Sequence, residues 1–215
     1  HGLYAIVILT VQRPASLVGS PGRSVEVLPY VVRYELNAQS LLERNATVHP
    51  AFHAHALSPE LLARTSGIPA AATSQPLVIL GCGSVGSKIA MHLGRAGFGS
   101  MTFVDNESMS PHNAARHALI ERASVLVPPR KSALMKTVFE ELSHLQSRAF
   151  DADAVTLLVD PERFATTVPQ DAALIVDTTA SLQVLAAETQ SKALDQSPAR
   201  LARVVMYGQG RCVAV

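Results

Sequence analysis

At 215 residues the chain is long enough for one large domain, or for a nucleotide-binding domain with a smaller partner segment. Hydrophobic residues make up 48% of the sequence, aromatic residues only 5%, and tryptophan is absent, a balance typical of Ala-, Val- and Leu-rich helices layered on a sheet. The 18 Lys and Arg residues nearly equal the 17 Asp and Glu residues, which excludes a strong positive field and argues against a nucleic-acid partner. Composition therefore favours an α/β fold.

Cysteine content and hydropathy indicate the cellular compartment in which the protein is expected. The two cysteines, Cys82 and Cys212, are too few for a disulfide framework or a four-cysteine zinc site. The longest apolar run, residues 4–9, is far shorter than the roughly 20 residues of a membrane span. We therefore expect a cytoplasmic protein without a membrane partner. Because the chain stops within strand-like residues 211–215, we also expect a fragment that is truncated at its C-terminal end.

The first third of the chain reads as a β-rich segment. β-Branched runs at residues 5–11 and 25–28, split by Ser20-Pro21-Gly22, predict strands around a turn. Ser58-Pro59-Glu60 is typical of a helix start, and a linker of small residues follows it. We therefore divide the chain into a β-rich N-terminal segment with its linker, residues 1–70, and a nucleotide-binding domain, residues 71–215.

Strands and helices alternate after Pro76. Short apolar runs predict buried strands at residues 77–80, 101–104 and 174–176, with further strands at residues 154–158 and 204–206. Apolar residues at helical spacing predict helices at residues 85–96, 134–145 and 182–189. This alternation predicts a Rossmann-like, doubly wound and largely parallel sheet, whose ligand lies at the carboxyl ends of the strands.

The strongest motif is Gly81-Cys82-Gly83-Ser84-Val85-Gly86, which follows a predicted strand and opens a predicted helix. Glycine lets the backbone turn tightly and approach a phosphate, while free N–H groups and the positive end of the helix face the anion. Asp105 ends the next strand, where a carboxylate can accept both ribose hydroxyls of a nucleotide. These features fit NAD as well as ATP.

Polar and cationic residues further along the chain favour ATP. Asn113 and Arg116 lie in one short segment and Lys131 in another. A hydride-transfer enzyme needs no second cluster of cations, whereas a nucleoside triphosphate carries charge that a dinucleotide's bridged pyrophosphate does not. We therefore expect ATP to be the nucleotide of this site.

Taken in order, these motifs resemble the ThiF/MoeB/HesA and ubiquitin-activating-enzyme family over about residues 77–215. The resemblance rests on residues 81–90, Ala96-Gly97-Phe98-Gly99, Val104-Asp105, Asn113-x-x-Arg116 and Lys131. It implies ATP-dependent adenylation, with magnesium, of the C-terminal carboxylate of a ubiquitin-like or sulfur-carrier protein that ends in Gly-Gly. The family usually acts as a homodimer. The sequence around Gly86 and Arg116-His117 is more similar to a divergent bacterial branch fused to a conjugating-enzyme-like segment, of which residues 3–36 would be the tail.

The resemblance also assigns roles to single residues. It implies that Asp105 binds the ribose, that Asp177 holds the metal, and that Arg116 and Lys131 are catalytic. Further nucleotide contacts come from the phosphate-binding turn and the following loop, namely Gly81, Gly83, Ser84, Val85, Gly86, Asn113, Arg116 and Lys131. Ala180 stands where the family commonly has a second metal-binding aspartate. Neither cysteine occupies a convincing position for a thioester, so such a cysteine would lie beyond Val215 or be absent.

Two alternatives stay open at this stage. Ala180 favours a pseudo-activating subunit that binds nucleotide without turnover. The glycines and Asp105 also fit a NAD-dependent oxidoreductase, which is weakened because no catalytic His or Lys-Tyr pair is identifiable near a substrate site.

Overall fold

The computed structural model describes residues 2–17, 22–35, 46–52, 57–120, 127–143, 146–207 and 212–214. The chain divides into two compact units, His1–Ala56 and Leu57–Val215. The domain boundary expected near residue 70 stays a prediction. In the structure, α1 (Pro59–Ser66) begins at the predicted helix start and α2 (Ala70–Thr73) lies in the predicted linker, and both belong to the second unit. No helix among the described residues is long and apolar enough to cross a membrane.

The first unit is a three-stranded antiparallel sheet in the order β1-β2-β3. β1 (Gly2–Gln12) pairs with β2 (Val25–Glu35) along its whole length, and β3 (Ala46–Pro50) adds to the other edge of β2. The two predicted strands are confirmed and are longer than the apolar runs that indicated them. β3 was not predicted, because its short sequence contains a histidine and ends on a proline, which is tolerated at a sheet edge.

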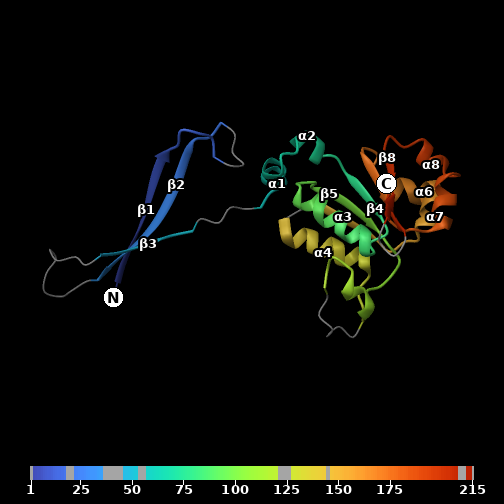
Figure 1. The fold of residues 1–215 in the computed structure, drawn as a ribbon, viewed down its shortest axis with the longest axis horizontal. Helices are drawn as coiled ribbons and strands as arrows, with labels where there is room; N and C mark the ends of the chain where they lie inside the picture. The colour runs from blue at the N-terminus through green and yellow to red at the C-terminus, as the bar shows by residue number, and fades with distance from the viewer. Residues whose placement is uncertain are drawn as a thin grey trace. The chain divides into compact units, whose positions relative to one another are not determined.

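The second unit is built on a five-stranded parallel sheet in the order β6-β5-β4-β7-β8 (Figure 1). Its strands are β4 (Leu77–Leu80), β5 (Ser100–Val104), β6 (Gln146–Phe150), β7 (Leu174–Asp177) and β8 (Arg200–Arg203). The chain runs from β4 outward to β6 and then returns to β7 on the other side of β4. The strand order thus reverses between β4 and β7, the place where open α/β sheets bind ligands. The predicted Rossmann-like fold is confirmed.

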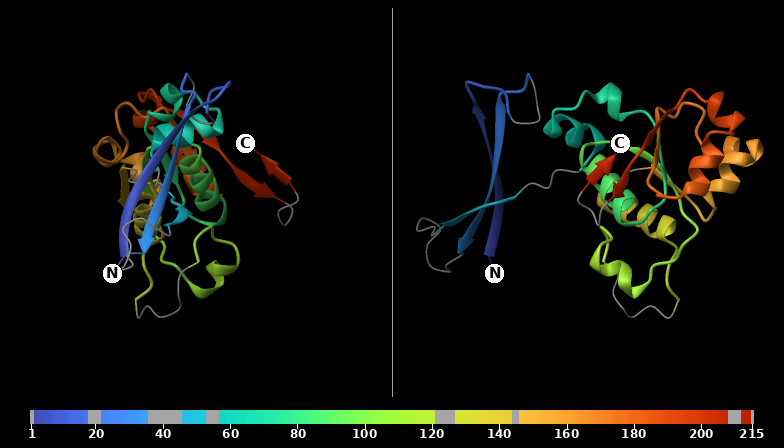
Figure 2. Two further views of the ribbon diagram at one scale, coloured as in Figure 1. Left: turned by 90° about the vertical axis from the view of Figure 1, so that its left-hand side faces the viewer. Right: turned by 45° about the vertical axis from the view of Figure 1, so that its right-hand side comes forward.

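Helices cover both faces of this sheet. In β4, Leu77 and Ile79 belong to the core that includes residues of α3 (Ser84–Arg95) and α4 (Lys131–Ser143). The ribbon views of Figure 2 show helices on both sides of the sheet. The alternate residues Val78 and Leu80 pack in the opposite core, whose helices are α5 (Ala154–Val159), α6 (Pro161–Thr167), α7 (Leu182–Glu188) and α8 (Lys192–Asp195). Successive side chains of a strand point to opposite faces, so a central strand that is buried on both sides is continuously apolar.

One predicted strand is wrong. Residues 154–158 form helix α5, and the strand beside β5 is β6, eight residues earlier. Asp153 starts the helix, because its Oδ2 accepts the backbone N–H of Thr156 at 2.9 Å. A short apolar run cannot distinguish a strand from a buried helix, and here the capping aspartate decides. The predicted strand at residues 204–206 corresponds to β9 (Val205–Tyr207), which pairs with β10 (Cys212–Ala214) in a separate hairpin.

Candidate functional site

The turn after β4 requires glycine at two positions. Gly81 has a φ of +85°, and a Cβ there would lie 3.1 Å from the backbone of Thr179. A Cβ on Gly86 would lie 1.9 Å from the carbonyl oxygen of Gly81 and 2.4 Å from Oγ1 of Thr178. The first turn of α3 therefore packs directly against the glycine loop. This close packing brings the N-terminus of α3, which begins at Ser84, to the carboxyl ends of β4 and β7, as an anion-binding turn requires.

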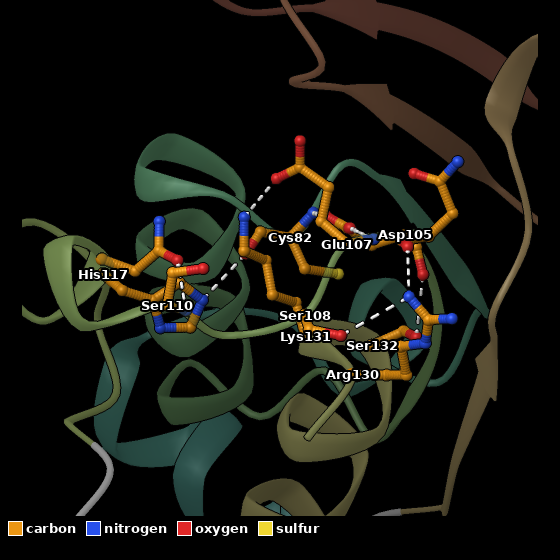
Figure 3. A network of polar contacts seen from close by, with 11 residues as sticks. Cys82, Asp105, Glu107, Ser108, Ser110, His117, Arg130, Lys131 and Ser132 are labelled. Atoms are coloured by element: carbon orange, nitrogen blue, oxygen red, sulfur yellow. Dashed lines mark hydrogen bonds and ion pairs between the residues drawn. The ribbon is translucent and has the colours of Figure 1, made fainter. Parts of the chain in front are cut away.

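Asp105 connects this turn to the end of β5. Its Oδ2 accepts the backbone N–H of Cys82 at 2.6 Å, and its Oδ1 accepts that of Glu107 at 2.7 Å (Figure 3). Burial raises the pKa of the Asp105 carboxyl, while the two N–H donors and the nearby Lys131 ammonium act in the opposite direction. The carboxylate is thus held in one orientation beside the glycine turn, with its remaining lone pairs available to a ligand.

A cavity of about 280 Å³ opens at this edge of the sheet. Its walls come from the glycine turn, from the loop after β5, from the start of α5 and from the segment after β7. The lining residues are Gly81, Gly83, Val104, Asp105, Asn106, Glu107, Ala152, Asp153, Ala154, Val155, Thr178, Thr179, Ser181, Gln183 and Val184. The position agrees with the ligand crevice expected at the switch point of a doubly wound sheet. Gly81, Gly83 and Asp105 are the predicted site residues that line it.

Lys131 lies beside this cavity. It is the first residue of α4, its side chain is only 5% exposed, and its ammonium forms an ion pair with the carboxylate of Glu107. The hydrogen bond and the positive charge of Lys131 lower the pKa of the Glu107 carboxyl. Ser132 donates a hydrogen bond from Oγ to the carbonyl oxygen of Asp105 at 3.1 Å, which ties the start of α4 to the end of β5. Glu107 lines the cavity and also pairs with Lys131. The Lys131 ammonium therefore lies next to a residue of the cavity wall.

Asn113 and Arg116 belong to the short 3-10 helix η1 (Pro111–Ala115) and its C-terminal cap, and neither lines the cavity. Asn113 is buried, and its Oδ1 accepts the backbone N–H of Ser110 at 2.7 Å. The carbonyl oxygen of Arg116 accepts hydrogen bonds from Nζ of Lys88 at 2.6 Å and from Oγ of Ser84 at 3.0 Å. η1 is therefore fixed to the first turns of α3, and the exposed Arg116 side chain follows directly after it.

His117 contributes to the site although its contacts were not predicted. The ring is buried, with Nε2 2.8 Å from the carbonyl oxygen of Cys82 and Nδ1 3.1 Å from the backbone nitrogen of Leu119. Since the N–H of Leu119 can only donate, we assign Nδ1 as the acceptor and place the ring proton on Nε2. His117 thus holds the glycine turn from the side opposite Asp105. The only signal in the sequence was the pair Arg116-His117 itself, which resembles the divergent bacterial branch of the family.

Asp177, the predicted metal ligand, has other partners. Its side chain is 1% exposed, and its Oδ1 accepts the N–H and the Oγ1–H of Thr179 at 2.8 and 2.6 Å. Its Oδ2 lies 3.3 Å from Nε of Arg203, whose guanidinium also forms an ion pair with the buried Glu188. No group of three or more His, Cys, Asp or Glu side chains within the described ranges is arranged to hold a metal ion. Both oxygens of the Asp177 carboxylate thus have partners within the chain, and its role as a metal ligand stays a prediction.

Comparison with known proteins assigns the family. The model of the ThiF family matches residues 65–187, which is more than half of the chain. The chain belongs to the ThiF family. A curated relative, uncharacterized protein y4oA of Sinorhizobium fredii, is 31% identical over 137 residues, which cover 59% of this chain and 23% of that protein. The ThiF-family chain thus spans less than a quarter of the length of this relative.

Solved structures share the fold. E. coli MccB with ATP has a TM-score of 0.52 and 18% identity, over 68% of this chain and 43% of that one. E. coli tRNA N6-threonylcarbamoyladenosine dehydratase, TcdA, in complex with AMP has a TM-score of 0.50 and 21% identity, over 61% and 50% of the two chains. At these identities the likeness establishes the fold alone.

Proposed function

We propose that this ThiF-family chain binds ATP at the glycine turn and transfers its adenylyl group to a carboxylate. The observation that carries the proposal is the position of Asp105. Its carboxylate accepts an N–H of the glycine turn itself and lines the same cavity as Gly81 and Gly83. A ribose acceptor and a phosphate-binding turn therefore lie side by side, as a nucleotide requires. The ATP and AMP complexes of the similar MccB and TcdA folds support the choice of adenine nucleotide.

The reaction needs little from the protein beyond position and charge. A carboxylate oxygen of the acceptor attacks the α-phosphorus of ATP, a new O–P bond forms, and the bond to the departing pyrophosphate breaks. No general base is required, because the attacking carboxylate is already ionised. In our proposal Lys131 and Arg116 stabilise the charge that moves onto the pyrophosphate, with Asn113, Ser84 and Val85 bordering the phosphates. Magnesium finds no fitting donor set at Asp177, and we assign it no step.

The finer assignments follow the family resemblance. We propose that the acceptor is the C-terminal carboxylate of a ubiquitin-like or sulfur-carrier protein ending in Gly-Gly, and that the intact protein acts as a homodimer. Sedimentation equilibrium at micromolar concentrations is expected to show the dimer. A monomer over the whole concentration range would contradict the assembly without affecting the nucleotide assignment.

A thermal-shift comparison of nucleotides tests the proposal. A ligand that binds only the native state at 100 times its Kd stabilises that state by about 2.7 kcal/mol. We expect ATP to raise the Tm more than NAD or NADP does, and Asp105→Ala to remove most of the ATP shift. Pyrophosphate exchange into ATP in the presence of Gly-Gly proteins then tests the transfer. A larger shift with NAD would favour the oxidoreductase.

A second candidate is a nucleotide-binding subunit without turnover. The ion pair of Asp177 with Arg203, together with Ala180, favours it, because both remove acidic ligands from the site. ATP would then raise the Tm as before, but no candidate acceptor would support pyrophosphate exchange. The two measurements together distinguish the adenylyltransferase, the silent subunit and the oxidoreductase.

A further inference from the structure

Arg203 and Asp177 face each other across neighbouring strands. They are paired residues in the parallel register of β7 and β8, and both lie at the carboxyl ends of their strands. The Arg203 guanidinium lies between Asp177 and Glu188, whose side chains are 1% and 2% exposed. Two buried carboxylates thus share one cation. Removing one partner of such a group leaves an uncompensated buried charge, which is strongly destabilising.

The network controls a wall of the nucleotide cavity. Asp177 holds Thr179 through two hydrogen bonds, and the neighbouring Thr178 places its Oγ1 2.6 Å from the carbonyl oxygen of Gly81. Both threonines line the cavity. The orientation of Asp177 therefore fixes the segment that packs against the glycine turn, and Arg203 fixes the orientation of Asp177.

The same contacts oppose a protein-bound magnesium ion. Mg²⁺ keeps several of its waters and is held by one or two carboxylates together with substrate phosphates. A carboxylate that is 1% exposed and accepts two hydrogen bonds and an ion pair leaves no space for such a hydrated ion. Ala180 supplies no side-chain oxygen, although its φ of +53° is a conformation that aspartate tolerates.

We infer that Arg203, in place of a divalent cation, is the positive partner of Asp177, so that ATP binds here without a metal ligand from the protein. Arg203 is accordingly a positioning residue for the cavity wall at Thr178 and Thr179. The inference rests on the proposed nucleotide function. It also gives a physical reason for Ala180 in place of the usual second aspartate. Arg203 already supplies the positive charge beside Asp177, so no second metal-binding carboxylate is needed.

The experiment is calorimetric titration of the full chain with ATP, once with Mg²⁺ and once with EDTA. Each protein gives a ratio of its Kd in Mg²⁺ to its Kd in EDTA. Comparing the ratio of a variant with that of the wild type cancels the effects of magnesium on ATP that do not depend on the substituted residue. We expect the ratio for Asp177→Asn to stay within about twofold of the wild-type ratio, because independent effects add to within about that factor. If Asp177 held the metal, the ratio would change by about 10-fold or more, and the inference would be overturned.

A second pair of variants tests the same ratio with Asp177 intact. Ala180→Asp alone keeps Arg203 and is expected to leave the ratio as in the wild type. Ala180→Asp combined with Arg203→Met frees two carboxylates and is expected to strengthen ATP binding in Mg²⁺ relative to EDTA by about 10-fold. Arg200→Met, an exposed position at the start of β8, is the matched control for Arg203→Met. A magnesium gain in Ala180→Asp alone would contradict the inference, whereas wild-type protein that binds ATP in neither buffer would contradict the proposed function itself.

Discussion

Asp105 combines two demands that pull its ionisation in opposite directions. Burial raises its pKa, yet only the ionised carboxylate can accept two ribose hydroxyls while also accepting the N–H groups of Cys82 and Glu107. Because the folded-state pKa is raised, the stabilisation linked to Asp105 is fully present below its unfolded pKa of about 3.9 and is lost as pH rises through the folded pKa. At neutral pH the buried, ionised Asp105 carboxylate therefore lowers the stability of the protein without nucleotide.

The raised pKa predicts an acid limit on nucleoside binding. We expect the affinity for adenosine, which has no phosphate to titrate, to fall on acidification at a pH above the ordinary aspartate pKa of about 4. Calorimetric titrations at a series of pH values measure it. Asp105→Asn is the control and should bind weakly with no such dependence. Affinity that stays constant down to the ordinary aspartate range would show that the ionised carboxylate is not the ribose acceptor.

Lys131 is expected to matter more for turnover than for binding. Its ammonium is buried beside the cavity wall, so it is a preorganised donor for the charge that develops on pyrophosphate. Loss of one such donor typically costs on the order of 10²–10³ in rate. Lys131→Ala should therefore reduce pyrophosphate exchange far more than it raises the Kd for ATP. Lys136→Ala, at a partly exposed lysine of the same helix, is the control. If Lys131→Ala and Arg116→Ala both leave exchange and binding intact, the phosphate assignment is wrong.

At the scale of elements, the turn between β4 and α3 depends on one close approach. A Cβ on Gly86 would overlap the carbonyl oxygen of Gly81, whereas a Cβ on Gly83 meets nothing within 4 Å. Overpacking of this kind costs typically about 1–3 kcal/mol, and here it displaces the turn itself. We predict that Gly86→Ala lowers the free energy of unfolding in urea and removes the Tm shift with ATP. Gly83→Ala should unfold like the wild type, and equal stabilities of all three proteins would refute the packing argument.

The sequence was informative for elements that are buried on both sides. β4, β5 and β7 are almost wholly buried and mostly apolar, and they were predicted within a residue or two of their bounds. The edge strands were missed, because Gln146–Phe150 and Arg200–Arg203 are partly exposed and carry polar residues. Their short sequences contain no pattern that would distinguish a strand from a helix or a loop.

The same distinction applies to the site. The glycine turn and Asp105 could be predicted because their roles follow from position after a strand. The contacts of His117 and Arg203 could not, since they join residues 35 and 26 positions apart and depend on how the loop at η1 folds back and on the register of β8. Asp177 was assigned from the resemblance alone, and only the register reveals the arginine opposite it.

At the scale of the whole molecule, the two units differ in how much they bury. The second contains both cores of the parallel sheet, the cavity, Lys131 and Arg203. Among the described residues of the first unit, Val32 is the only buried hydrophobic side chain, while Tyr4, Ile6 and Ile8 are more than half exposed. Sheets this small need a hydrophobic face that is packed against something to be independently stable.

This difference predicts that residues 57–215 fold and bind ATP without residues 1–56. Every residue that lines the cavity lies in the second unit, so the Tm shift with ATP should be the same in the shortened chain as in the full one. Residues 1–56 alone should show rapid amide hydrogen exchange, because their strands gain little from burial. Thermal shift and hydrogen exchange measure the two expectations separately. Loss of the ATP shift in residues 57–215, with their fold retained by circular dichroism, would mean that the first unit contributes to nucleotide binding.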